Sequence, residues 1–132
     1  MSLPKSFNHF ILFVVALFLS LLLITSLSVL IHIIAIRLLD HKGIFSFYSV
    51  ISELFMGLII PLPFLPKILM IIANCLPFRY LSDFPYRMYT GNISVNYGTL
   101  LLINAIFWII IIIVIGNILT NLTLKKVVVQ GG

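Results

Sequence analysis

The sequence predicts an all-α polytopic membrane protein with three transmembrane helices and a re-entrant helical pair between the second and third. Composition is the first observation: hydrophobic residues make up 62% of the 132 residues, charged residues only 8%, and the mean hydropathy is +1.27. A soluble domain carries about a quarter charged residues, so this chain cannot cover an aqueous surface with polar groups. The second observation is that long uncharged runs alternate with short polar stretches.

The balance of charge excludes some functions. The formal net charge is +5, but the longest basic run is Lys125 followed by Lys126. In a membrane protein such an excess sets topology and meets anionic lipid, so we expect no nucleic-acid binding. Cys75 is the only cysteine in the sequence and His32 has no partner at metal-ligand spacing, so we expect neither a disulfide nor a metal site.

The first predicted span covers residues 10–36, which carry no formal charge. A bilayer core of about 30 Å needs roughly 20 helical residues, and a secretory signal has an apolar region of only about 7–15 residues followed by a cleavage site. We therefore expect a permanent, tilted span. Its hydroxyl side chains either bond back to their own helix or pack against a neighbouring helix, and packing is favoured; they are Ser20, Thr25, Ser26 and Ser28.

The second predicted span covers residues 44–60 and follows a polar turn at residues 37–42 that is closed by Gly43. Glu53 interrupts it. A carboxylate inside a span costs about 2.5–3.5 kcal/mol unless it is paired, protonated or wet. Two interpretations stay open: Glu53 lines a substrate path or gate, or it makes a structural polar contact at a shallow depth.

The third predicted span covers residues 100–119, and the run WIIIIIVI lies at its centre. Lys125 and Lys126 follow its end. With the segment at residues 61–91, the three spans are expected to form a single transmembrane unit over residues 1–132.

Prolines divide the segment between the second and third spans. Pro61, Pro63 and Pro66 forbid a regular helix, because each lacks an N–H and restricts the residue before it. Residues 67–76 can form a ten-residue helix about 15 Å long, which is half the thickness of a membrane. Pro77 ends that helix.

Residues 78–89 mix aromatic rings with Arg79, Asp83 and Arg87, as is typical of a membrane interface. If this stretch is helical, Asp83 can pair with either arginine at i,i±4 spacing, a geometry that Pro85 is expected to disturb. The chain is expected to enter the membrane, turn and return to the same face; the alternative is a loop lying flat on the membrane. Because irregular backbone at membrane depth must be buried in protein or line a wet cavity, we expect partner helices from outside this chain.

Three motifs resemble the C-terminal half of ABC-2 family transporter permeases: GLIIPLPFLP at residues 57–66, LPFRY at residues 76–80, and FPYR at residues 84–87 together with Gly91. The resemblance extends over residues 10–132. It implies six spans per permease half, of which this sequence carries the equivalents of the fourth, fifth and sixth, and it places residues 61–91 on the outer face and residues 37–42 in the cytoplasm. The implied gate and re-entrant residues are Glu53, Pro61, Pro63, Pro66, Pro77, Arg79, Asp83, Pro85 and Arg87.

The function that the resemblance implies is a permease subunit of an ABC-type exporter in the plasma membrane. The sequence has no GxxxxGK[ST] motif, so ATP is expected to be bound by a partner ABC ATPase subunit and not by this chain. A second permease chain and the lipid bilayer are the other expected partners. Because the first three family spans are missing, we expect half of a split permease, a truncated product or a shortened relative.

Two other classes of function were weighed. A small membrane protein that does not transport, such as a bacteriocin immunity or assembly factor, would act through helix–helix contact and is the alternative hypothesis. An intramembrane enzyme is not expected, because the sequence has no HExxH or GxSxG motif and Glu53 alone cannot do paired acid–base work. No catalytic, cofactor-binding or metal-binding residue is therefore predicted.

Overall fold

The computed structural model describes residues 3–131, except for the side chains of residues 127, 129 and 130. Within this range the chain is helical and contains no strand, which confirms the all-α prediction. In chain order the elements are α1 (Phe7–Leu38), α2 (His41–Phe55), the 3-10 turn η1 (Leu62–Phe64), α3 (Lys67–Cys75), the 3-10 turn η2 (Pro77–Tyr80), α4 (Asp83–Tyr89) and α5 (Val95–Gly131).

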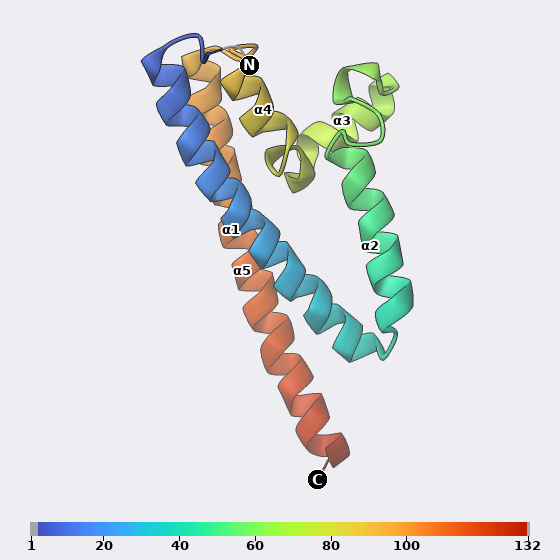
Figure 1. Cartoon of the computed structure of the whole chain (residues 1–132). Helices are drawn as coiled ribbons and strands as arrows, with labels where there is room; N and C mark the ends of the chain where they lie inside the picture. The colour runs from blue at the N-terminus through green and yellow to red at the C-terminus, as the bar shows by residue number, and fades with distance from the viewer. Residues whose placement is uncertain (1–2, 132) are drawn as a thin grey trace.

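Helices α1 and α5 form the long axis of the molecule and pack against each other (Figure 1). In the described part of the chain, two stretches are long and apolar enough to cross a membrane, Phe7–Leu38 and Val95–Lys126. Each has 32 residues, or about 48 Å of helix, and they contain the predicted first and third spans. Near their far ends the Lys126 ammonium lies 3.5 Å from the Arg37 carbonyl oxygen, so α1 and α5 remain close there.

Helix α2 is shorter than the predicted second span. It has 15 residues, about 22 Å of helix, and ends at Phe55, whereas the prediction placed the end at residue 60 before the first proline. Gly57 has φ +81° and stops the helix through a Schellman motif. In this motif the Gly57 N–H donates to the Leu54 carbonyl at 3.2 Å, and the Leu58 N–H donates to the Glu53 carbonyl at 3.1 Å.

The turn between α1 and α2 is also tighter than predicted. Leu39 adopts the left-handed conformation with φ 57°, and Asp40 already caps α2 by accepting the Gly43 N–H at 2.9 Å. The predicted polar turn at residues 37–42 was too long, because Gly43 lies inside α2 and does not close the turn. The two helices therefore run in opposite directions through a two-residue connection (Figure 1).

The segment between α2 and α5 runs toward the middle of the molecule and then back toward the end where α5 begins. Figure 1 shows α3 and α4 meeting at η2, with α4 returning to the end of the molecule where α5 begins. Helix α3 matches the predicted helix at residues 67–76 to within one residue. Pro85 does not interrupt α4, because it is the third residue of this helix and the first residues of a helix have no intrahelical acceptor to lose.

Helical elements of the chain itself bury η2. All four residues of Pro77–Tyr80 are buried, and η2 contacts α1, α2, α3, α4 and α5. The Ser20 hydroxyl of α1 donates to the Leu81 carbonyl at 2.6 Å in a buried position. The expectation that this stretch needs helices from outside the chain is therefore corrected for η2.

The hydroxyl side chains of α1 divide between the two predicted roles. Ser20 joins two elements, whereas Thr25 and Ser26 donate at 2.7 Å to carbonyls of their own helix, Leu21 and Leu22 respectively. A bond to another element is therefore confirmed for Ser20, whereas the hydroxyls of Thr25 and Ser26 bond within α1 although both residues line a hollow between α1 and α5.

Replacing Ser20 by alanine should lower the free energy of unfolding by about 1–3 kcal/mol, because the Leu81 carbonyl would stay buried without a donor. Thermal unfolding in detergent measures the effect. The matched control is Ser26→Ala, which removes only a bond within α1 and should leave stability nearly unchanged. Equal effects of the two substitutions would contradict the role given to Ser20.

Candidate functional site

A cavity of about 320 Å³ lies where α3, η2, α4 and the first turn of α5 come together. Four of its polar residues, Asn74, Arg79, Asp83 and Arg87, are here called the arginine–aspartate cluster. The remaining lining residues are Leu62, Pro63, Met70 and Tyr97.

Arg79 is the buried charge of this cluster. It lies on η2, is only 6% exposed, and its Nη1 donates to Asn74 Oδ1 at 2.7 Å. Its guanidinium carbon lies 5.8 Å from the centroid of the Tyr80 ring. Its Nε is buried and has no hydrogen-bond partner among the described residues. A buried cation with a single neutral hydrogen-bond partner is costly unless something else compensates its charge.

Asp83 and Arg87 form the predicted i,i+4 pair on α4. Arg87 Nη1 lies 3.8 Å from Asp83 Oδ2, a loose ion pair that is too long to be a hydrogen bond. Within residues 3–131, Asp83 Oδ2 is buried without a hydrogen-bond partner. Arg79 makes its hydrogen bond to Asn74 and not to Asp83. The cluster therefore holds two arginine charges near a single carboxylate.

Burial raises the pKa of Asp83 above its usual value of 3.8. The charges of Arg87 and, more weakly, Arg79 act in the opposite direction and offset part of this rise. Burial likewise raises the pKa of Tyr80, an effect that nearby Arg79 and a side-chain hydrogen bond with Asn104 partly offset. Burial therefore disfavours the ionised forms of Asp83 and Tyr80.

The stability of the chain should fall as the pH rises through the raised pKa of Asp83. The folded chain holds this proton to a higher pH than the unfolded chain does, so the contribution is fully present below the unfolded pKa and lost above the folded one. Asn cannot titrate at position 83. The melting temperature of Asp83→Asn minus that of the unmodified chain should therefore increase as the pH increases.

Melting curves of both proteins in detergent, from about pH 3 to about pH 8, measure this difference. The sequence has three Asp and Glu residues in all, so few other groups titrate in the acidic part of the range. A difference that stays constant, or that moves in favour of the unmodified chain at higher pH, would show that the ion pair with Arg87 outweighs burial.

The structure brings together four of the nine residues proposed from the sequence. Pro63, Arg79, Asp83 and Arg87 line the cavity. Pro61 and Pro66 precede η1 and α3, while Pro77 and Pro85 are buried in the first turns of η2 and α4. Glu53 is exposed on α2, where it accepts a hydrogen bond from the Ser49 hydroxyl at 2.9 Å, and it is not among the residues described as lining this cavity.

Sequence reasoning missed four lining residues, the apolar Leu62 and Met70 and the polar Asn74 and Tyr97. Asn74 is the single uncharged polar side chain of the α3 sequence KILMIIANC apart from the thiol of Cys75, so an isolated amide in an apolar helix was the available signal. Tyr97 lies in the first turn of α5, and nothing in its local sequence connects it with α3 or α4.

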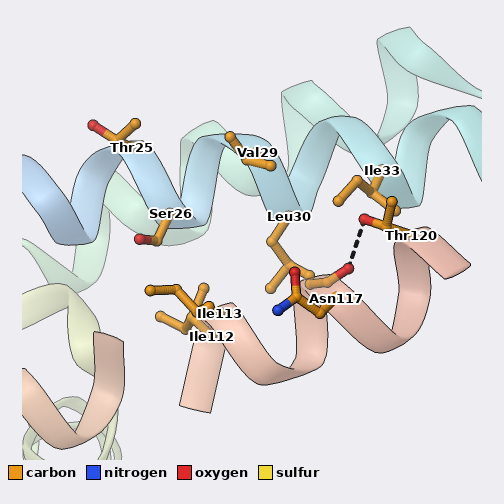
Figure 2. Close-up of a pocket in the computed structure, with 10 residues that line it drawn as sticks. Thr25, Ser26, Val29, Leu30, Ile33, Ile112, Ile113, Asn117 and Thr120 are labelled. Carbon is orange, nitrogen blue, oxygen red and sulfur yellow. Dashed lines mark hydrogen bonds between the residues drawn. The ribbon is translucent and has the colours of Figure 1, made fainter. Parts of the chain in front are cut away.

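A second hollow lies between the middle of α1 and α5 and has a volume of about 220 Å³. Figure 2 shows Ser26, Leu30 and Ile33 of α1 facing Ile112, Ile113 and Asn117 of α5. The Thr120 hydroxyl donates to the Gly116 carbonyl of its own helix at 2.7 Å, the dashed line in Figure 2. Thr25, Ser26 and Thr120 already bond within their own helices, so this hollow offers few free donors for a ligand.

Two helices of the described chain are long and apolar enough to cross a membrane, and the charged cavity lies near the start of the second of them. A sequence model of the family described as "ABC-2 family transporter protein" matches residues 1–131, so the chain belongs to the ABC-2 transporter family. This confirms the resemblance drawn from the proline–aromatic motifs. Comparisons with curated proteins and with solved structures found no match. The family forms the membrane component of transporters and is not itself catalytic.

Proposed function

We propose that the chain is a permease subunit of an ABC-type exporter in the plasma membrane. A separate ABC ATPase subunit would bind and hydrolyse ATP, and a second permease chain would complete the translocation path. Family membership supports the transport role. The structural observation that carries the proposal is the burial of η2 among the five α-helices, because irregular backbone is tolerated at membrane depth only where protein or a wet cavity surrounds it.

The proposed topology has three passes, corresponding to the last three of the six spans in the family resemblance. Helix α2 alone is shorter than a bilayer core of about 30 Å. Leu58, Ile59 and Ile60 are exposed and apolar, so they extend the hydrophobic length of the second pass beyond Phe55. Local thinning of the bilayer can accommodate the remaining mismatch.

The segment from residue 61 to residue 91 would then be a re-entrant element at the outer end of the path. Contacts of η2 with α1, α2 and α5 support this role, because a relative tilt of these helices must alter its packing. Closure of the partner ATPase would supply that tilt. The arginine–aspartate cluster would lie beside the tilting helices and η2, and so belong to the outer gate.

Counts of lysine and arginine do not decide which end faces the cytoplasm. Four lie toward the α1–α2 turn and the end of α5: Arg37, Lys42, Lys125 and Lys126. The other four lie toward the α4 end: Lys5, Lys67, Arg79 and Arg87. A labelling experiment therefore has to test the side. The family resemblance places the α4 end outside.

Single-cysteine labelling of intact cells tests this topology. In a Cys75→Ser background, Asn92→Cys in the exposed connection from α4 to α5 should react with a membrane-impermeant maleimide added outside. Lys42→Cys, exposed at the start of α2, should react only after the membrane is permeabilised. The reverse pattern, or labelling of both positions in intact cells, would contradict the proposed arrangement.

Co-expression with the neighbouring open reading frames tests the transport role. The chain should purify together with an ATPase and a second membrane chain, and the reconstituted complex should hydrolyse ATP in a lipid-dependent manner. If the chain runs alone as a monomer and captures neither partner, the permease proposal fails.

A further inference from the structure

Arg79 lines the cavity with a guanidinium that is only partly hydrogen-bonded. The residue is more than nine-tenths buried, and its Nε, itself shielded from solvent, finds no acceptor in the part of the chain that the structure describes. The planar guanidinium of arginine binds carboxylate and phosphate groups through two parallel hydrogen bonds to their oxygens. Asn74 occupies Nη1 only, so this guanidinium retains free donors.

Other donors lie around the same space. The Asn74 oxygen accepts from Arg79, which leaves the amide N–H₂ of Asn74 available, and the Arg87 guanidinium and Tyr97 also line the cavity. With Asp83 ionised, the two arginines and this carboxylate leave a formal charge of +1, which matches a singly charged anion such as a phosphodiester.

Part of the cavity wall is apolar. Leu62, Pro63 and Met70 line it beside the polar side chains. A ligand with a charged head and a hydrocarbon chain fits this combination, because its head would meet the donors while its chain would contact the apolar part of the wall.

We propose that the arginine–aspartate cluster binds a phosphate or phosphodiester group, supplied by the headgroup of a phospholipid or by free phosphate. The Arg79 guanidinium, the Asn74 amide and the Arg87 guanidinium donate to the phosphate oxygens. The inference is independent of the export proposal, since it concerns occupancy of a cavity formed within this chain.

Burial of Arg79 does not by itself stabilise the folded chain. A buried cation with one neutral hydrogen bond carries a desolvation cost that this single bond does not offset. Arg79→Met should therefore fold at least as stably as the unmodified chain when no phosphate is present. It should lose the stabilisation that a phosphate-bearing ligand gives to the folded state.

The test uses the full chain in a detergent without phosphate groups. Its melting temperature is measured with short-chain phosphatidylglycerol, with inorganic phosphate, or with diacylglycerol of the same chain length. Phosphatidylglycerol should raise the melting temperature and diacylglycerol should not. An equal rise with inorganic phosphate identifies free phosphate as a sufficient ligand, whereas a rise with the phospholipid alone identifies the headgroup of a lipid.

Variants locate the binding. Arg79→Met and Arg87→Gln should each weaken binding of the effective ligand at least tenfold, and Arg87→Gln carries the test if Arg79→Met fails to fold. The matched control is Lys67→Gln, which removes an exposed charge from the start of α3 that does not line the cavity. The proposal is wrong if no phosphate compound binds, if diacylglycerol acts as well as phosphatidylglycerol, or if Lys67→Gln weakens binding as much as Arg87→Gln.

Discussion

Replacing Phe84 by alanine is expected to lower the free energy of unfolding by about 3–5 kcal/mol, the range for truncating a large buried aromatic side chain. Phe84 is 1% exposed and its ring packs edge-on against Tyr80, with centroids 6.1 Å apart. Helix α4 has only seven residues, too few to be stable by itself. Its position therefore depends on this packing and on its contact with α1.

Chemical unfolding in mixed micelles measures the loss. Tyr86→Ala is the matched control, because Tyr86 lies two residues further along α4 and is 66% exposed. It should change stability by well under 1 kcal/mol, as expected for a surface substitution. Similar losses for the two variants would show that α4 is not anchored through Phe84.

Replacing Phe78 by alanine is expected to separate α2 from the α3–α4 segment and to cost about 3–5 kcal/mol. The Phe78 ring of η2 lies 6.2 Å from Tyr48 and 6.3 Å from Phe55, both on α2, measured between ring centroids. Aromatic pairs of this kind contribute about 0.5–1.5 kcal/mol beyond the apolar area they bury. Phe78 thus carries the aromatic contact between the second helix and the buried turn.

A distance measurement distinguishes this separation from general destabilisation. Spin labels on the native Cys75 and on Ser46→Cys, which is exposed on α2, should give a narrow distance distribution that broadens with Phe78→Ala. Phe64→Ala removes the same ring from an exposed position in η1 and should leave the distribution unchanged. A distribution that stays narrow in Phe78→Ala would show that α2 is held through α1 alone.

Local chemistry explains why much of the fold could be predicted. The uncharged runs within α1 and α5 follow from composition, and α3 was bounded to within one residue by Pro66 and Pro77. The end of α2 was misplaced because prolines at residues 61–66 were read as the stop, whereas Gly57 had already ended the helix. A glycine in an apolar run is ambiguous until the conformation of its backbone is known.

The candidate site was predictable only in part. The i,i+4 spacing of Asp83 and Arg87 sufficed for their pair, because both lie on one short helix. The partner of Arg79 could not be predicted from the sequence, since η2 is a 3-10 turn that directs Arg79 toward Asn74 of α3. Glu53 stood out in the sequence as a charge within an apolar run, yet it is exposed on α2 and bonds to Ser49 of its own helix.

The sequence by itself determined that this is a helical membrane protein of the ABC-2 family, because apolar run length and proline positions are local properties that need no knowledge of contacts. Tertiary structure alone decided how the segment between α2 and α5 is buried and which charges meet there. Ser20 and Leu81 bond across 61 positions of sequence, and residues from η1 to α5 enclose one cavity. Such contacts depend on how α1, α2 and α5 pack around η2, which no spacing within a single segment encodes.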